Sequence, residues 1–448
     1  MAYLLRKNIW KPAQIIVLFY ILAVIVSTAL LSLPVALKPD ASWSFVDVLF
    51  TAVSAVSVTG LSTVPIVDML STTGIFFFLF ILQFGGIGIM TLGTFIWLMV
   101  GKKIGMKERQ LIKTDQNQSN LSGLVKLMKQ ILVIILIIEF FGALVLGTYF
   151  LTYFPTWQEA YMQGLFASVS ATTNAGFDIT GNSLIPFADD YFVQIVTILL
   201  LTLGAIGFPV LIEVKDFLKT RSQGHFHFSL YTKLTTVTFF SLMVFGTVII
   251  LLLEFNHFFA GKSWHESFFY ALFQSSTTRN GGLATMDVNQ FSEPTLLALC
   301  LLMFVGASPS SVGGGIRTTT FAVILLLIVS FARGSKDVRV FGRELHEEDI
   351  RKSVVVGFLA LLICMVATMI LTATEPFTLM EIIFEVNSAF GTTGLSMGIT
   401  ADLSTAGKIV IIALMFIGRI GILSFIYLFN RRREEAAYHL PKERVIVG

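Results

Sequence analysis

The sequence is poor in charge. Only 13 % of its 448 residues are Asp, Glu, Lys or Arg, whereas hydrophobic residues make up 55 %. A soluble domain usually has about 25 % charged residues, so an ordinary water-soluble domain is excluded. Apolar runs of about 20 residues, long enough to cross the hydrocarbon core of a bilayer, account for the missing charge. The composition therefore predicts an integral membrane protein.

Reactive and metal-binding patterns are missing as well. The only two cysteines, Cys300 and Cys364, stand in apolar stretches, where they behave as small hydrophobic residues. No zinc-protease, nucleophile-elbow or Walker motif is present, and the acidic run 346–349 is interpreted as a solvated loop. We therefore expect no enzymatic activity, no organic cofactor and no nucleic-acid partner.

Eight apolar segments are long enough to be transmembrane helices. They cover residues 14–37, 72–100, 131–154, 191–214, 234–253, 295–331, 353–373 and 407–429. The sixth is interrupted by the small and polar residues 306–315. Irregular backbone is tolerated at membrane depth only inside protein or beside water, so this interruption predicts a cavity.

The distribution of Lys and Arg predicts the orientation in the membrane. The two termini and the loops 101–130, 215–233 and 332–352 hold 25 of the 31 Lys and Arg residues. Cytoplasmic loops carry such an excess, so both termini are expected to be cytoplasmic in a multi-pass protein of the plasma membrane. The opposite side holds 15 acidic residues and four basic ones. An acidic outer mouth would concentrate cations.

Four shorter segments between the paired spans align on a glycine without gaps. Each has a large apolar residue ten positions before the glycine and a serine six positions before it. The glycines Gly60, Gly176, Gly282 and Gly394 are 116, 106 and 112 residues apart. A near-constant period indicates repeats, and we predict units of span, short helix, glycine loop and span at 1–100, 101–222, 223–335 and 336–430, followed by a tail at 431–448.

The expected fold is all-α, with eight transmembrane helices in four such units around one central pore. Glycine allows backbone conformations closed to other residues, and four loops around an axis would present rings of carbonyl oxygens that replace an ion's hydration shell. The residues predicted to form these rings are Val58, Thr59, Gly60, Asn174, Ala175, Gly176, Asn280, Gly281, Gly282, Thr392, Thr393 and Gly394. Glycines that only permit close helix packing are the alternative.

The four loops in register resemble those of the Trk/Ktr/HKT superfamily of potassium transporters, and within it the KtrB-type membrane subunit. The resemblance covers nearly the whole chain, including Ser57-Val-Thr-Gly-Leu61 and Gly391-Thr-Thr-Gly-Leu395. It implies K+ as the permeant ion, with glycine in all four loops matching the potassium-selective pattern, and leaves Na+ as an activating ion open. It also implies a homodimer in membrane lipid that rests on cytoplasmic, nucleotide-binding KtrA-type subunits.

The same resemblance implies a gate below the loops. It assigns this role to the intramembrane loop 306–316, in particular Gly313, Gly314 and Gly315, and to Arg419 in the last span. A charged residue within a span is functional by default, although a buried ion pair is the alternative for Arg419. Arg279 is expected to point behind its loop toward Glu381 or Glu385.

Two readings of the whole chain compete with a pore. A sodium-coupled or sodium-permeable secondary transporter with alternating access is the first, but such folds often have inverted repeats, whereas paired spans give all four units one orientation. An intramembrane enzyme is the second, and the missing catalytic groups argue against it. We also expect Glu139, in the third span, to make a structural hydrogen bond.

Overall fold

The structure is a computed structural model that describes residues 12–88, 104–115, 123–220 and 226–429, together with residues 91, 93, 441 and 443. Helices dominate the described chain. They are α2 (Pro12–Leu31), α3 (Phe45–Ser57), α4 (Ile66–Met69), α5 (Thr72–Ile87), α7 (Met106–Asp115), α8 (Leu124–Phe150), α9 (Trp157–Thr172), α10 (Tyr191–Ala205), α11 (Phe208–Thr220), α12 (Leu230–Glu254), α13 (Trp264–Thr277), α14 (Glu293–Val305), α15 (Thr318–Ala332), α16 (Glu347–Thr374), α17 (Leu379–Gly391), α18 (Thr405–Ile420) and α19 (Ile422–Phe429). Three short 3-10 helices and a hairpin of β1 (Arg339–Val340) and β2 (Arg343–Glu344) complete the described elements.

Four of these helices, α2, α8, α12 and α16, are each long and apolar enough to cross a membrane. Two further candidates are bent pairs, α10 with α11 and α18 with α19, which turn by 102°. The bends were not predicted, since only the sixth apolar segment was expected to be broken. Gly207 and Gly421 stand at the two bends with φ of 103° and 88°, a region that glycine enters without strain.

The two remaining apolar segments are seen in part or in two pieces. Helix α5 covers the first part of the segment 72–100, and most of the rest lies outside the described residues. The segment 295–331 consists of α14 and α15 with residues 306–317 between them, as the small and polar run predicts. The tail predicted at 431–448 lies outside the described residues apart from two isolated positions.

The four short helices α3, α9, α13 and α17 begin in the same way. A Ser or Thr precedes each helix, and its side-chain oxygen accepts a hydrogen bond from the backbone of an acidic residue three positions later. These N-cap pairs are Ser44 with Asp47, Thr156 with Glu159, Ser263 with Glu266, and Thr378 with Glu381. The cap satisfies a backbone donor that a helix start leaves unpaired, and the acid favours the positive end of the helix dipole.

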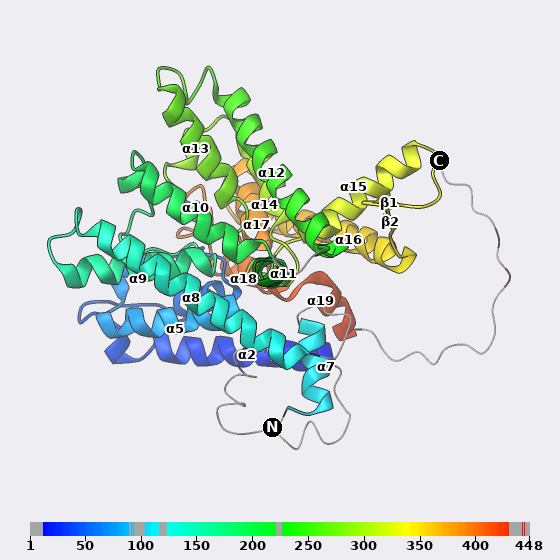
Figure 1. Cartoon of the computed structure of the whole chain (residues 1–448). Helices are drawn as coiled ribbons and strands as arrows, with labels where there is room; N and C mark the ends of the chain where they lie inside the picture. Colours follow the sequence, from blue (N-terminus) through cyan, green and yellow to red (C-terminus); the bar gives the residue numbers. More distant parts are fainter. Residues whose placement is uncertain are drawn as a thin grey trace.

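The helices pack around these four in a cyclic order. Helices α2, α8, α12 and α16 each contact the short helix that follows them in the sequence. Helices α5, α10, α14 and α18 contact the next short helix in turn, so that α5 packs on α9, α10 on α13, α14 on α17, and α18 returns to α3. Figure 1 shows α2, α5 and α8 side by side along one edge of the molecule.

Glycines permit three of these helix contacts. A side chain at Gly85, Gly204 or Gly418 would strike the backbone carbonyl of Val56, Thr172 or Phe390, at the end of a short helix. Gly306, which stands at the corresponding spacing in the sequence, instead ends α14 and faces Gly314. Packing is therefore the role of the first three, and the fourth belongs to the interruption of its span.

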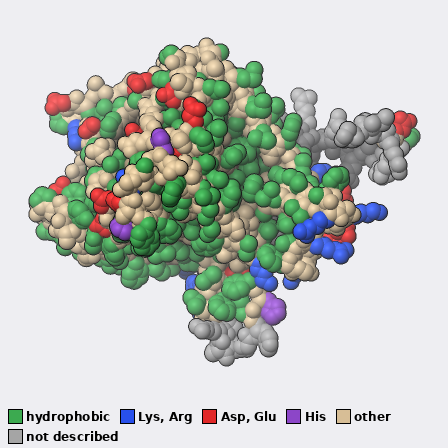
Figure 2. All heavy atoms as spheres, turned by 90° about the horizontal axis from the view of Figure 1, so that it is seen from above, with side chains coloured by type: hydrophobic (Ala, Val, Ile, Leu, Met, Phe, Trp, Pro, Cys, Tyr) green, Lys and Arg blue, Asp and Glu red, His purple; other side chains and the backbone are tan. Residues whose placement is uncertain are grey.

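The surface matches a protein surrounded by lipid. Large hydrophobic side chains of the long helices are exposed, among them Ile25, Phe140, Val244 and Met369. Figure 2 shows hydrophobic side chains over much of one face, with most Asp and Glu side chains toward the left end and most Lys and Arg side chains toward the right. The apolar face needs a hydrocarbon environment.

Candidate functional site

The four glycine loops, residues 58–60, 174–176, 280–282 and 392–394, share one backbone conformation. The first residue of each loop is left-handed although it is not glycine, with φ of 56° at Val58, 52° at Asn174, 71° at Asn280 and 52° at Thr392. The glycine that ends each loop also has a positive φ, between 68° and 99°. Non-glycine residues held at positive φ are costly and cluster at functional sites, and here all four are fully buried.

In three of the four loops, the serine six positions before the glycine helps to shape the turn. The backbone N–H groups of Thr59, Ala175 and Thr393 donate to the carbonyl oxygens of these serines at 2.8, 2.7 and 2.8 Å. In the first and fourth loops the serine hydroxyl then accepts from the backbone N–H of the glycine, at 3.2 Å for Gly60 and 3.0 Å for Gly394. The spacing found in the sequence is therefore the spacing of a hydrogen-bonded turn.

The third loop departs from this pattern. Gly281 donates its N–H to the carbonyl of Thr277 at 2.6 Å, and the hydroxyl of Ser276 bonds back into its own helix, to the carbonyl of Leu272. The hydroxyl of Thr277, the next residue, donates instead to the carbonyl of Leu283, which follows the glycine loop, at 2.6 Å. The third loop, with Asn280-Gly281, thus has a different local hydrogen bonding.

The loops meet in a closed ring. A side chain at Gly60 would lie 2.7 Å from the carbonyl oxygen of Ala175, and one at Gly176 would lie 3.3 Å from that of Gly281. A side chain at Gly282 would strike the carbonyl of Thr393, and one at Gly394 would strike that of Thr59. Each glycine therefore faces the middle residue of the next loop. The structure brings all twelve residues predicted for the carbonyl rings to one place.

The four short helices end at this ring. Helices α3, α9, α13 and α17 finish at Ser57, Thr172, Thr277 and Gly391, with at most two residues between each helix and its loop. A helix C-terminus carries a partial negative charge of about half an elementary charge. The ring is thus a place where a cation is favoured by helix ends and can be met by backbone oxygens.

The buried loop, residues 306–317 between α14 and α15, lies against two of the glycine loops. Its Gly314 donates a backbone N–H to Oγ1 of Thr392 at 2.8 Å. A side chain at Gly313 would lie 2.5 Å from Cγ of Asn280. Its other end is held by Tyr231, whose hydroxyl donates to the carbonyl of Pro309 at 2.6 Å. The sequence predicted the loop but not these contacts.

Arg419 joins α18 to the buried loop. Its two terminal nitrogens donate to the carbonyl oxygens of Val312 in the buried loop and of Gly85 near the end of α5. The side chain is buried, and it forms no ion pair with any residue that the structure describes. Of the two readings weighed for Arg419, the described structure does not support the ion pair.

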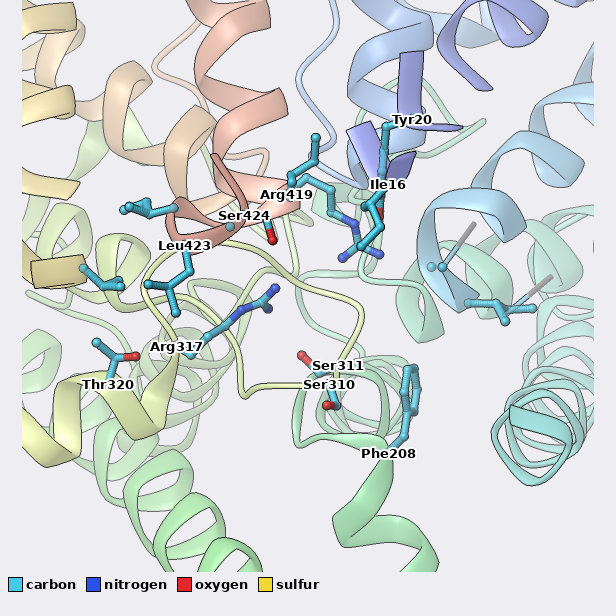
Figure 3. Close-up of a pocket in the computed structure, with 18 residues that line it drawn as sticks. Ile16, Tyr20, Phe208, Ser310, Ser311, Arg317, Thr320, Arg419, Leu423 and Ser424 are labelled. Carbon is cyan, nitrogen blue, oxygen red and sulfur yellow. The ribbon is translucent and has the colours of Figure 1, made fainter. Parts of the chain in front are cut away.

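A cavity of about 120 Å³ opens beside Arg419. Figure 3 shows the guanidinium groups of Arg317 and Arg419 pointing into it, with hydroxyl groups of Ser310, Ser311 and Ser424 around them. Its lining residues, all in the described part of the chain, include no Asp or Glu. The cavity predicted from the interrupted span is present, and the two guanidinium groups make its charge positive.

The prediction that Arg279 points toward Glu381 or Glu385 is wrong. Arg279 is fully buried and does point behind its loop, but its terminal nitrogen donates to the carbonyl of Leu302 in α14. Glu381 caps its own helix, and Glu385 accepts hydrogen bonds from Ser396 and Thr400 at 2.8 and 2.5 Å. A helix carbonyl as the partner of an arginine leaves no signal in the sequence.

Glu139 makes the structural hydrogen bond expected of it. Its carboxylate accepts from Nε2 of Gln83 in α5 at 2.7 Å, which joins α8 to a neighbouring helix. Among the described residues no group of three or more His, Cys, Asp or Glu could hold a metal ion.

Comparison with known proteins identifies the family. The family described as "TrkH: Cation transport protein" matches residues 11–439, nearly the whole chain. The chain belongs to this TrkH family. It is a family of transport proteins and not of enzymes, as the missing catalytic motifs predict.

Two relatives from Bacillus subtilis (strain 168) are similar over almost their full length. Identity is 64 % over 438 residues to Ktr system potassium uptake protein D, with 98 % of this chain and 97 % of the relative covered. Identity is 34 % over 443 residues to Ktr system potassium uptake protein B, with the same coverage. The resemblance seen in the glycine loops is confirmed, and similarity to protein D is the greater of the two.

A solved structure of the TrkH family supports the fold. The crystal structure of the potassium transporter TrkH from Vibrio parahaemolyticus matches with a TM-score of 0.74 and 20 % identity, over 95 % of this chain and 86 % of that one. At this identity the match establishes a shared TrkH fold.

Proposed function

We propose that the protein takes up potassium ions through one pore lined by the four glycine loops. The observation that carries the proposal is the closed ring, in which each glycine faces a carbonyl of the next loop. Rings of carbonyl oxygens can replace the hydration shell of a monovalent cation. The names of the two Bacillus relatives, both potassium uptake proteins, support potassium as the ion.

The pore belongs to a chain of eight spans in four units, 1–100, 101–222, 223–335 and 336–430. The spans are α2, a span that begins with α5, α8, α10 with α11, α12, α14 with α15, α16, and α18 with α19. The cyclic packing of these helices on the four short helices supports this division. Uptake is driven by the membrane potential, which supplies about 2.3 kcal/mol per charge for each 100 mV.

Both termini are proposed to lie in the cytoplasm. The separation of acidic and basic side chains toward opposite ends supports this orientation (Figure 2). The side rich in Lys and Arg, which carries the β1–β2 hairpin, is then the cytoplasmic one.

The buried loop and Arg419 are proposed to be the gate. The loop lies against the glycine loops through Gly313 and Gly314, and Arg419 holds it through Val312. In this arrangement the pathway is obstructed by backbone and by a positive charge. A homodimer with a cytoplasmic ring of nucleotide-binding subunits would move the gate. The resemblance of the sequence supports this assembly, as does the Ktr-system name of the relatives.

Uptake of K+ and Na+ by potassium-starved cells that lack their own uptake systems tests the proposal. Cells that express the chain with a cognate soluble subunit should accumulate K+ in preference to Na+, at a rate that follows the membrane potential. Equal uptake of the two ions would reject the potassium-selective ring. Uptake that requires a sodium gradient at fixed potential would favour the coupled secondary transporter, whereas stimulation by Na+ without such coupling would identify Na+ as an activator.

A further inference from the structure

The hydroxyl of Thr392 lies at the meeting point of three segments. Its Oγ1 accepts from the backbone N–H of Gly314 at 2.8 Å and from Nδ2 of Asn280 at 3.0 Å. The same Asn280 nitrogen donates to the carbonyl of Thr392 at 3.1 Å and to the carbonyl of Gly391. Asn280 and Thr392 are both completely buried. The hydrogen-bonded chain therefore joins the third glycine loop, the fourth glycine loop and the buried loop away from solvent.

The glycines of the buried loop make this contact possible. A side chain at Gly314 would lie 2.6 Å from both Oγ1 and Cγ2 of Thr392. A side chain at Gly313 would lie similarly close to Asn280, 2.5 Å from its Cγ. The backbone can reach the glycine loops only because neither residue has a side chain.

The first two glycine loops offer no matching contact. Val58, at the position of Thr392, has no polar side-chain atom, and Asn174 has no hydrogen bond to the buried loop among those the described residues make. The side-chain contact between the buried loop and the glycine loops is therefore one-sided. It involves the side chains of the third and fourth loops, whereas ion binding would use the carbonyl groups of all four.

We propose that Thr392 and Asn280 are positioning residues that latch the buried loop closed and transmit its displacement to the third and fourth glycine loops. This inference rests on the proposed pore and deepens it, because it makes gating and ion preference two results of one contact. When the buried loop leaves, the Thr392 hydroxyl loses a donor and the backbone N–H of Gly314 must find another acceptor. Left-handed residues persist only where their surroundings hold them, so the backbone at Asn280 and Thr392 is expected to relax at the same time.

Replacement of the hydroxyl tests the latch. Thr392→Val keeps the branched shape but cannot accept from Gly314, whereas Thr392→Ser keeps the hydroxyl. Loss of one buried hydrogen bond shifts a two-state equilibrium roughly five- to tenfold. We expect uptake in the absence of the cognate soluble subunit to rise by that factor in Thr392→Val, with a changed ratio of K+ to Na+ uptake. The rise should be clearly smaller in Thr392→Ser, because this variant keeps the acceptor for Gly314.

Thr285→Val is the matched control. Thr285 is also buried, it follows the third glycine loop, and its hydroxyl has no hydrogen-bond partner among the described residues. This variant should leave both the uptake rate and the ion ratio unchanged. If Thr392→Val does not reach the membrane, Thr392→Ala removes the same hydroxyl and carries the same expectation.

Hydrogen exchange gives a second readout on the purified protein. The peptide that contains Gly314 should exchange its amide protons faster in Thr392→Val than in the wild type or in Thr392→Ser. Wild-type uptake and exchange in folded Thr392→Val, or an equal effect of Thr392→Ser or Thr285→Val, would overturn the latch. Absence of ion uptake by the wild-type chain would instead reject the pore itself.

Discussion

The ammonium group of Lys408 lies 2.9 Å from a carboxylate oxygen of Asp47, although 361 positions separate the two residues. Lys408 belongs to α18 and Asp47 to α3, so the pair joins the last part of the helix ring to the first. The side chains are only 14 % and 17 % exposed. This ion pair closes the ring of helices at the point where the chain itself does not connect them.

Loss of either partner should destabilise the ring. A charge-assisted hydrogen bond contributes about 1.5–3 kcal/mol, and we expect Lys408→Met or Asp47→Asn to lower the unfolding free energy by an amount in that range. A thermal unfolding scan in detergent measures the change. Because both single variants remove the same contact, the double variant should cost clearly less than the sum of the two. Additive losses would show that the pair contributes nothing as a pair.

The same ion pair predicts that the fold loses stability at low pH. Burial tends to raise the pKa of Asp47, but hydrogen bonds from Ser44 and Lys408 outweigh it, and the pKa lies below its ordinary value of 3.8. A carboxylate with a lowered pKa stabilises the fold above the ordinary value, and this contribution disappears as the pH falls through the folded-state pKa. Melting temperatures between pH 5 and pH 3 should therefore fall more for the wild type than for Asp47→Asn. Parallel curves would contradict the prediction.

Gly60→Ser should weaken the preference for K+ over Na+. The residue has a φ of 99°, and a side chain there would lie 2.7 Å from the carbonyl oxygen of Ala175, so the ring must deform to admit it. Gly261→Ser is the control, because Gly261 also has a positive φ, 84°, but has open space around it. Competitive uptake of the two ions measures the ratio. An unchanged ratio of K+ to Na+ uptake in Gly60→Ser that reaches the membrane would show that the ring does not select the ion.

Arg419→Gln should increase the rate of conduction. At roughly 5 Å and an effective dielectric near 20, a fixed charge opposes a passing cation by about 3 kcal/mol, which would slow passage about a hundredfold before water screens it. Arg419→Lys keeps the charge but cannot donate to both Val312 and Gly85. Flux that rises in the Gln variant and not in the Lys variant assigns the effect to the charge. An equal rise in both variants assigns it to loss of the hydrogen bonds from Arg419 to Val312 and Gly85. Reduced flux with a lowered melting temperature would reject the barrier.

Removal of Val312 to Gly315 should raise basal uptake and weaken its dependence on the regulator. The deletion takes away the acceptor of Arg419 and the donor to Thr392 together. It should also change the ratio of K+ to Na+ uptake, although it removes no residue of the four glycine loops. Unchanged or reduced uptake by deleted protein that reaches the membrane would argue against a gate.

The short helices and glycine loops can be predicted from the sequence more clearly than the contacts between them. The short helices end close to the glycines that mark these segments in the sequence, and the serine spacing corresponds to hydrogen bonds in three of the four loops. These features are local, and so the pattern of residues records them. The fourfold Ser/Thr and acid caps were also readable but were missed.

Other features depend on residues far apart in the chain. A glycine within an apolar run fits either a bend or close packing, so the bends at Gly207 and Gly421 could not be told from the packing glycines. Arg279 and Arg419 bond to backbone carbonyls, which every residue offers, and no sequence pattern marks such a partner. The contact of Thr392 with Gly314 requires the orientation of a side chain that composition does not set.

The four glycine loops of the ring belong to one polypeptide chain, so each loop can be altered separately. In a tetramer of identical subunits a single codon changes all four positions at once, and intermediate states need mixed assemblies. Here each loop faces only the next in a fixed direction, from Gly60 to Ala175 and from Gly394 back to Thr59. Replacement of one, two, three or four glycines would thus give a graded series in which the number and the order of damaged neighbours are both known. Natural selection has the same freedom to tune one side of the ion's path while it leaves the other three untouched.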